Sequence, residues 1–355
     1  MFVLDSHCDT PSQILRLRDL SVDNGHSHVD FPKLRRGGVD GAFFALYVPA
    51  SKNETEAFDY AGRLFAGVER TVAENGDMCA FATNRDEAVK NKAKGLFSVF
   101  LGLENGSPIG NDIHRLKYFY DKGVRYVTLC HSSDNLICDS CASKEKRWGG
   151  LSLFGREVVA EMNRLGMLID VSHVSDDSFY DVLKYSDRPV VATHSCCRAL
   201  SDHPRNMTDE MIRALASAGG VVQINFYPLF LDSRFSEILS SSGLVELGES
   251  VENEFIKNPS NPDFRAAWNR VQDALQALPR PSYKLIADHI DHVVDLVGIE
   301  HVGIGSDYDG IEVTPDGMED ISMMPKLFDE LRMRGYSESD LSKIASENFF
   351  RCLEA

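Results

Sequence analysis

Histidines and carboxylates follow several apolar runs of the sequence and are the residues most able to do chemistry. His7 and Asp9 come directly after the first run, two positions apart. In chain order the residues at these positions are His7, Asp9, Glu104, His131, His173, His194 and Asp307. Imidazole nitrogens and carboxylate oxygens are ligands that zinc prefers in proteins. The set predicts a zinc site if the fold brings these residues together.

Two zinc ions account for this set of residue types. His7 and Asp9 form a compact chelate for one ion. Glu104 can bridge two ions through its two carboxylate oxygens, and His173 and His194 complete the second ion. Two such ions can hold a bridging hydroxide and polarise a carbonyl group. That is the chemistry that hydrolysis of an amide at neutral pH requires.

Each of these residues alone also has an ordinary structural explanation. A lone buried histidine is more often a hydrogen-bonded core residue than a metal ligand. Asp9 by itself could cap a turn, and Glu104 by itself could pair with an arginine. Only their joint placement at the ends of separate strands favours the metal site.

The elements that must position these residues alternate along the chain. Eight apolar runs are typical of buried parallel strands: residues 2–6, 42–48, 96–103, 125–130, 167–171, 190–193, 220–225 and 301–306. Helical patterns are expected at residues 56–73, 85–94, 113–122, 153–165, 177–185, 208–218, 284–297, 325–334 and 338–352. Eight strands favour a closed (β/α)8 TIM barrel, although an open doubly wound sheet would show the same alternation. In a barrel all these strand ends meet at one face, which carries the active site.

We expect residues 1–355 to form a single hydrolase barrel domain with one large insertion. The insertion, residues 228–283, separates the seventh and eighth strands and is much longer than a usual barrel connection. On the catalytic face it would act as a lid or as a wall of the substrate pocket.

Composition excludes several classes of protein. The net charge is −17 and no basic stripe is present, so we expect no binding to nucleic acid. No apolar stretch approaches the ~18 residues of a membrane span, and the first residues do not look like a signal peptide. The eight cysteines are scattered, unlike a secreted disulfide framework. A cytoplasmic location without membrane attachment is expected.

The chain resembles the renal-type (membrane) dipeptidases, zinc metallopeptidases within the amidohydrolase-like barrels. The segments that carry the resemblance are DSHCDTP at 5–11, GLENG at 102–106, LCHSSDN at 129–135, DVSHVS at 170–175, THS at 193–195, HPRNMTDE at 203–210, QINFY at 223–227, ADHIDHV at 287–293 and GIGSDYDG at 303–310. Each segment alone is weak, but their order and spacing together are specific.

The resemblance implies the same five metal ligands and assigns roles to four further residues. His131 would contact the scissile carbonyl oxygen and stabilise the tetrahedral intermediate. Arg205, with Tyr227, would hold the terminal carboxylate of the substrate. Asp307 would carry the proton from the bridging water to the leaving amine.

The expected function is zinc-dependent hydrolysis of dipeptides through a metal-bridging hydroxide, with two Zn2+ per chain. One alternative is another amidohydrolase-type reaction on an N-acyl amino acid or a lactone, because Arg205 favours a free carboxylate without demanding a dipeptide. Another is an inactive binding barrel, whose signature would be a lost ligand, whereas all five ligands are present. The expected partner is a small dipeptide, and a homodimer is one option for the assembly.

Overall fold

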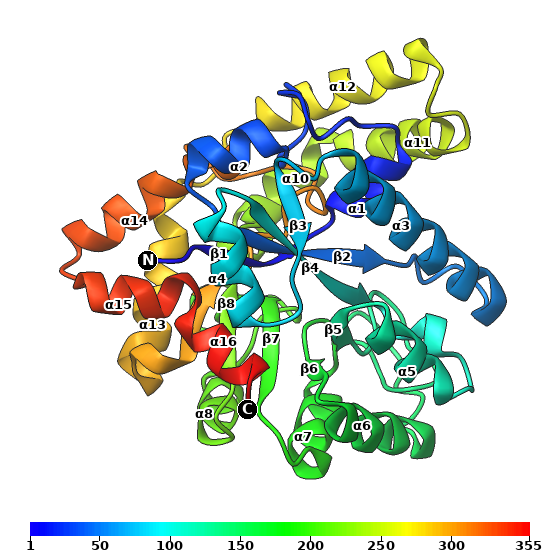
Figure 1. The fold of residues 1–355 in the computed structure, drawn as a ribbon, viewed down its shortest axis with the longest axis vertical. Coiled ribbons are helices and arrows are strands. Elements are labelled where there is room, and N and C mark those ends of the chain that lie inside the picture. Colours follow the sequence, from blue (N-terminus) through cyan, green and yellow to red (C-terminus); the bar gives the residue numbers. More distant parts are fainter.

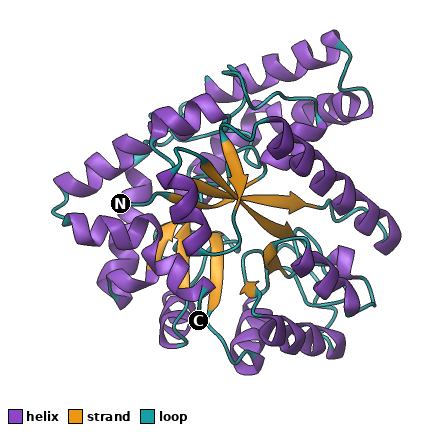
Figure 2. Cartoon of the chain, in the orientation of Figure 1, coloured by secondary structure: helices purple, strands orange, loops and turns teal.

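Parallel strands surrounded by helices form a barrel in the computed structural model, which describes residues 1–355 (Figures 1 and 2). Neighbouring strands pair in parallel in the order β1 (Leu4–Cys8), β2 (Gly41–Tyr47), β4 (Phe97–Glu104), β5 (Val124–Thr128), β6 (Leu168–Asp170), β7 (Val190–Ser195), β8 (Val221–Ile224) and β9 (Val302–Ile304). The predicted (β/α)8 TIM barrel is confirmed, and the eight predicted runs coincide with these strands apart from shifts at their ends.

Backbone hydrogen bonds beside the first and last strands nearly close the barrel. The Asp307 N–H donates to the His7 carbonyl at 3.0 Å, and the Asp9 N–H donates to the Tyr308 carbonyl at 2.8 Å. Residues some 300 positions apart are therefore neighbours. Closure of the barrel places Asp307 directly beside the predicted His7–Asp9 chelate.

Helices cover the outside of the barrel. They are α3 (Glu54–Glu74), α4 (Arg85–Ala93), α5 (His114–Asp121), α6 (Leu153–Leu165), α7 (Asp176–Tyr185), α8 (Asp209–Ser217), α13 (Lys284–Val297) and α14 (Met324–Met333). Side-chain caps begin several of them: the Ser152 oxygen accepts from the Gly155 N–H, and the Thr208 oxygen accepts from the Met211 N–H. Such caps explain why the predicted starts agree closely with the structure.

Some elements were not predicted or differ from the prediction. The short α1 (Thr10–Leu15), α2 (Phe31–Gly37) and β3 (Cys79–Phe81), which pairs with β4 outside the barrel order, were not predicted. The helix expected at 338–352 consists of α15 (Glu338–Ser342), a π-helical turn (Lys343–Glu347) and α16 (Asn348–Leu353). Elements of three to seven residues are too short for a repeating apolar pattern to reveal them.

Alternation along β4 directs Glu104 into the barrel. Successive strand residues point to opposite faces, so Phe100, Gly102 and Glu104 share one face. Phe100 stacks on Phe43 in the barrel interior, with ring centroids 4.8 Å apart. A Cβ atom on Gly102 would lie only 2.2 Å from the Tyr126 ring. The glycine therefore leaves room for Tyr126 beneath Glu104.

The insertion at 228–283 is helical. It contains α9 (Pro228–Leu231), α10 (Phe235–Ser242), α11 (Leu244–Lys257) and α12 (Pro262–Gln276). Figure 1 shows α10, α11 and α12 gathered on the side of the barrel where α1 lies. A small apolar cluster, which includes Phe235, Val271 and Leu275 together with Val313 from the loop after β9, packs them together.

Neither disulfides nor membrane-crossing helices contribute to this fold. All eight cysteines are free thiols, and seven of them are buried. No helix combines the length and the apolar character that crossing a membrane would take.

Candidate active site

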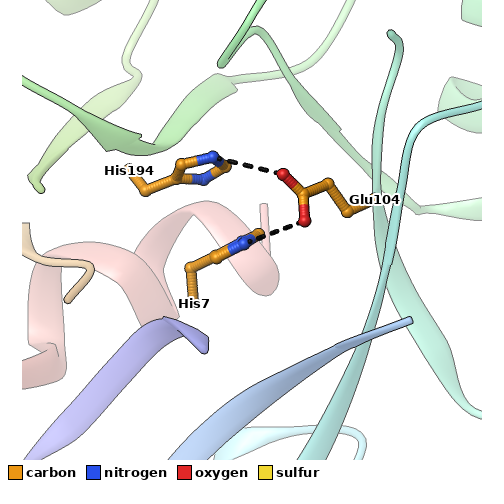
Figure 3. Close-up of side chains that lie close together, drawn as sticks. All are labelled: His7, Glu104 and His194. Atoms are coloured by element: carbon orange, nitrogen blue, oxygen red, sulfur yellow. Dashed lines mark ion pairs between the residues drawn. The ribbon is translucent and has the colours of Figure 1, made fainter. Parts of the chain in front are cut away.

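Glu104 lies at the centre of the predicted ligand cluster, at the C-terminal end of β4. Its Oε2 atom is 3.3 Å from His7 Nε2. Its Oε1 atom is 3.2 Å from His173 Nε2 and 3.5 Å from His194 Nε2. Figure 3 shows His7 and His194 facing different oxygens of this carboxylate. One carboxylate oxygen thus faces the first predicted ligand set and the other oxygen faces the second, an arrangement that suits a bridging ligand.

The remaining predicted residues of the cluster lie around this carboxylate. Asp9 and Asp307 have oxygens within 4.8 Å of each other and of a His7 ring nitrogen. His131 Nε2 lies 3.8 Å from Glu104 Oε1. The structure therefore brings together seven of the nine residues singled out in the sequence, all at the C-terminal ends of strands.

Buried polar atoms without partners indicate that these residues fit metal ions. His7 Nε2, Asp9 Oδ1 and Glu104 Oε2 are buried and form no hydrogen bond. Leaving such a group unsatisfied costs about 1–3 kcal/mol, so buried polar atoms are normally paired. Cations bound among them would remove this cost, and imidazole nitrogen with carboxylate oxygen is a donor set that suits zinc.

Hydrogen bonds behind the cluster orient the His194 ring. The Thr193 hydroxyl donates to Asp170 Oδ2 at 2.6 Å. Because this uses the only hydroxyl proton, the same oxygen can only accept from His194 Nδ1, 2.8 Å away. His194 Nδ1 then carries the ring proton, and a lone pair remains on Nε2, the atom that faces Glu104. This is the tautomer that a metal ligand needs.

Tyr126 supports the His7 ring from inside the barrel. Its hydroxyl lies 2.8 Å from His7 Nδ1, and the two rings stack with centroids 6.1 Å apart. The contact joins β5 to β1, two strands that are not neighbours in the sheet. It directs His7 Nε2 toward Glu104.

Unusual backbone conformations cluster around the site. His173, Asp307, Asp309 and Asn105 have φ values of 71°, 63°, 66° and 73°. Residues other than glycine rarely adopt this left-handed region, which costs about 1–3 kcal/mol for each, and such residues gather at functional sites. Here they lie just beyond the ends of three barrel strands.

A cavity of about 340 Å³ opens over the cluster. Glu104, His131, His173 and Asp307 line its inner part. Its other walls include Tyr47, Tyr227, Phe230, Arg16, Glu252, Trp268, Gln272 and Glu312. The volume is adequate for a small molecule. Phe230, Glu252, Trp268 and Gln272 come from the insertion at 228–283.

The structure separates the two residues expected to hold a carboxylate. Tyr227 lines the cavity, whereas Arg205 is 6% exposed and does not line it. The Arg205 guanidinium donates to Ser195 Oγ and to the His194 carbonyl, both at 2.8 Å, and its Nε has no partner. Arg205 is thus fixed against the strand end that carries His194 and keeps N–H donors to spare.

Comparison with known proteins identifies the family. A family model described as membrane dipeptidase, peptidase family M19, matches residues 1–355. Dipeptidase aclJ of Aspergillus oryzae is 32% identical over 350 residues, which cover 96% of this chain and 73% of that protein. Dipeptidase verJ of Clonostachys rogersoniana is 31% identical over 339 residues, which cover 93% of this chain and 76% of that protein. The chain belongs to peptidase family M19.

Solved structures agree with this assignment. Dipeptidase AC, a metallopeptidase of family M19, superposes on 100% of this chain and 98% of its own, with a TM-score of 0.80 and 27% identity. A metallopeptidase from Rhodobacter sphaeroides was solved with a phosphinate mimic of the dipeptide L-Ala-D-Ala. It superposes on 100% of this chain and 99% of its own, with a TM-score of 0.82 and 25% identity. The chain is therefore a dipeptidase of the M19 metallopeptidases.

Burial and neighbouring charges set the acidity of the M19 site. Burial raises the pKa of Asp307 to about 7, against the opposing effects of the nearby His7 and of the hydrogen bond from Asn225. Burial also acts to raise the pKa of Glu104, but His7, His173 and His194 together hold it well below its usual value. Glu104 is thus kept as a carboxylate, while Asp307 can exchange a proton near neutral pH.

Several residues that support the M19 site were not singled out in the sequence. They are Tyr126, Asp170, Thr193, Asn225 and Glu312. Asp170 and Thr193 do stand beside predicted ligands in the segments DVSHVS and THS. No local signal distinguishes Tyr126 or Glu312, because their roles depend on contacts with residues far away in the sequence.

Proposed function

We propose that this M19 dipeptidase hydrolyses the amide bond of dipeptides with two zinc ions bound to His7, Asp9, Glu104, His173 and His194. The arrangement of Glu104 carries the proposal, because each of its two oxygens faces a different group of imidazole nitrogens. Bound there, the ions would lower the pKa of water and polarise a carbonyl group.

The residues around the proposed ions divide the remaining tasks. His131 Nε2 lies near the ligand cluster and would donate a hydrogen bond to the scissile carbonyl oxygen as negative charge develops on it. Burial lowers the pKa of His131, so the ring is neutral and carries one N–H to donate. Asp307 would accept the proton of the attacking water and deliver it to the leaving amine.

Arg205 and Tyr227 would bind the substrate's terminal carboxylate. Arg205 retains N–H donors beyond the two used in its contacts with Ser195 and His194. Its guanidinium lies 5.6 Å from the centre of the Phe230 ring, and Phe230 lines the cavity beside Tyr227. For Arg205 to contact the substrate, the cavity wall at Phe230 has to move slightly or the substrate carboxylate has to enter the cavity deeply.

We also propose that the insertion at 228–283 acts as a pocket wall, supported by the four of its residues that line the cavity. The free, mostly buried thiols support our proposal of a reducing, cytoplasmic location.

A substrate panel tests the proposed reaction. The zinc-loaded protein is assayed with dipeptides, with N-acetyl amino acids and with lactones, before and after treatment with a chelator. We expect cleavage of dipeptides that is lost on chelation and restored by zinc. Faster turnover of N-acetyl amino acids or lactones would favour another amidohydrolase-type reaction. Absence of turnover in a fully loaded protein would indicate a binding barrel.

A further inference from the structure

Glu312 is a carboxylate in the cavity wall for which the chain supplies no cationic partner. It lies in the loop after β9, five positions beyond Asp307, and its side chain is exposed to the cavity. It forms no ion pair, whereas Glu252, on the same wall, pairs with Arg16. The Tyr227 side chain is a neighbour of this carboxylate in the cavity wall.

The surroundings of Glu312 make its negative charge unfavourable without a ligand. The protein that encloses the cavity raises the pKa of Glu312 by desolvation even though its side chain is open to the cavity, and the neighbouring carboxylates of Glu252 and Glu249 raise it further. Arg16 is already engaged by Glu252. A carboxylate that is partly removed from water and close to like charges is stabilised by a cation placed beside it.

We propose that Glu312 binds a cationic side chain of the substrate, so that the enzyme prefers dipeptides containing lysine or arginine. The inference rests on the proposed dipeptidase function. Tyr227, the neighbour of Glu312 in the cavity wall, is also the residue assigned to the substrate's terminal carboxylate. We therefore expect the C-terminal residue of the dipeptide to supply the cation.

Pairs of dipeptides that differ only in charge isolate this interaction. Norleucine resembles lysine without the ammonium group, so Ala-Lys is compared with Ala-norleucine, and Lys-Ala with norleucine-Ala. The C-terminal residue is supplied in both L and D forms. kcat/KM is measured for the zinc-loaded wild type, for Glu312→Gln and for Glu246→Gln. The last variant removes the same charge from an exposed residue that does not line the cavity.

In one pair we expect the wild type to cleave the lysine dipeptide with a kcat/KM about ten-fold higher than that of the matching norleucine dipeptide. This factor is the size of one charge-assisted contact. In Glu312→Gln this ratio should fall close to one, since glutamine keeps the size and polarity of the side chain but carries no charge. Glu246→Gln should keep the wild-type ratio. The pair that responds identifies the residue facing Glu312.

Three outcomes overturn the proposal. The wild type could show no preference for lysine in either pair, or the preference could survive in Glu312→Gln. Glu312→Gln could also slow all the dipeptides equally, which would mean that Glu312 contacts a group common to every dipeptide, such as the α-ammonium. If the wild type cleaves none of them, the proposed function itself fails, which is distinct from cleavage without a charge preference.

Discussion

The Thr193 hydroxyl lies 2.8 Å from Nδ1 of its neighbour His194 and thereby determines which ring nitrogen faces Glu104. Replacing Thr193 with Val removes this acceptor while keeping the shape of the side chain. We expect zinc affinity to fall about 10- to 100-fold, as is usual when the partner of a metal-binding histidine is lost. Competition with a chelating dye measures the affinity.

Thr128→Val is the matched control for Thr193→Val. The Thr128 hydroxyl donates to the same Asp170 oxygen at 2.5 Å, but Thr128 forms no hydrogen bond with a histidine. The zinc affinity of the Thr128→Val variant should stay near the wild-type value. Equal losses in the two variants would show that Asp170, and not the His194 tautomer, explains the effect.

Zinc content tests the bridging role of Glu104. Wild-type protein purified without chelator should contain about two zinc ions per chain by elemental analysis. Glu104→Gln should lower occupancy at both positions, because one carboxylate serves both. Glu252→Gln, a cavity carboxylate outside the ligand cluster, should retain both ions. Full occupancy and activity in Glu104→Gln would exclude the bridging assignment.

Arg205 should recognise the substrate's free carboxylate. Amidating the C-terminus of a dipeptide should lower kcat/KM for the wild type by about ten- to a hundred-fold, which corresponds to the loss of charge-assisted bonds worth roughly 1.5–3 kcal/mol. Arg205→Ala should lose a similar factor on the free acid and much less on the amide. Independent effects of the mutation and of amidation would mean that Arg205 is not the anchor.

Activity should fall on the acid side as Asp307 becomes protonated. Burial raises the pKa of Asp307 to about 7, and bound cations would shift the midpoint of the acid limb of kcat/KM below that value. Asn225 Nδ2 donates to Asp307 Oδ2 at 2.8 Å and stabilises the charged form. Asn225→Ala should therefore move the acid limb upward by up to about one pH unit. An unchanged limb, or a shift to lower pH, would argue against Asp307 as the group that titrates.

His289 should make the fold sensitive to acid. It is buried, its Nδ1 accepts the Cys197 N–H at 3.0 Å, and its Nε2 donates to the Leu231 carbonyl at 3.2 Å. Burial lowers its pKa to about 4 in the folded chain, whereas an unfolded histidine titrates near ~6.5. The unfolded state thus binds the proton first, and the stability that neutral His289 contributes above pH ~6.5 is lost as the pH falls toward 4.

Between pH 7.5 and pH 5, protonation linked to His289 lowers the free energy of unfolding by about 2 kcal/mol. Urea denaturation midpoints, measured in EDTA to exclude metal release, should fall more for the wild type than for His289→Gln. A pH dependence that is the same in both proteins would assign the acid sensitivity to other groups.

The sequence by itself determined the barrel and the core of the candidate site. Each barrel strand is an apolar run whose burial is visible locally, and His7, Glu104, His173 and His194 stand at or just beyond the ends of such runs. Parallel strands in a barrel end at one face, so knowing the strands was enough to predict that these side chains meet. Resemblance to a family added Arg205 and Tyr227, and it gave His131 a role that its position at a strand end does not reveal.

Only the tertiary structure decided how those residues are oriented and what surrounds them. Tyr126 supports His7 across the barrel interior, and Glu312 meets Tyr227 through loops that follow different strands. Arg205 is buried outside the cavity lining, although a residue that holds substrate would be expected to line it. Such contacts join residues that are far apart in the chain. They depend on strand register, barrel closure and loop conformation, which no local pattern of residue types encodes.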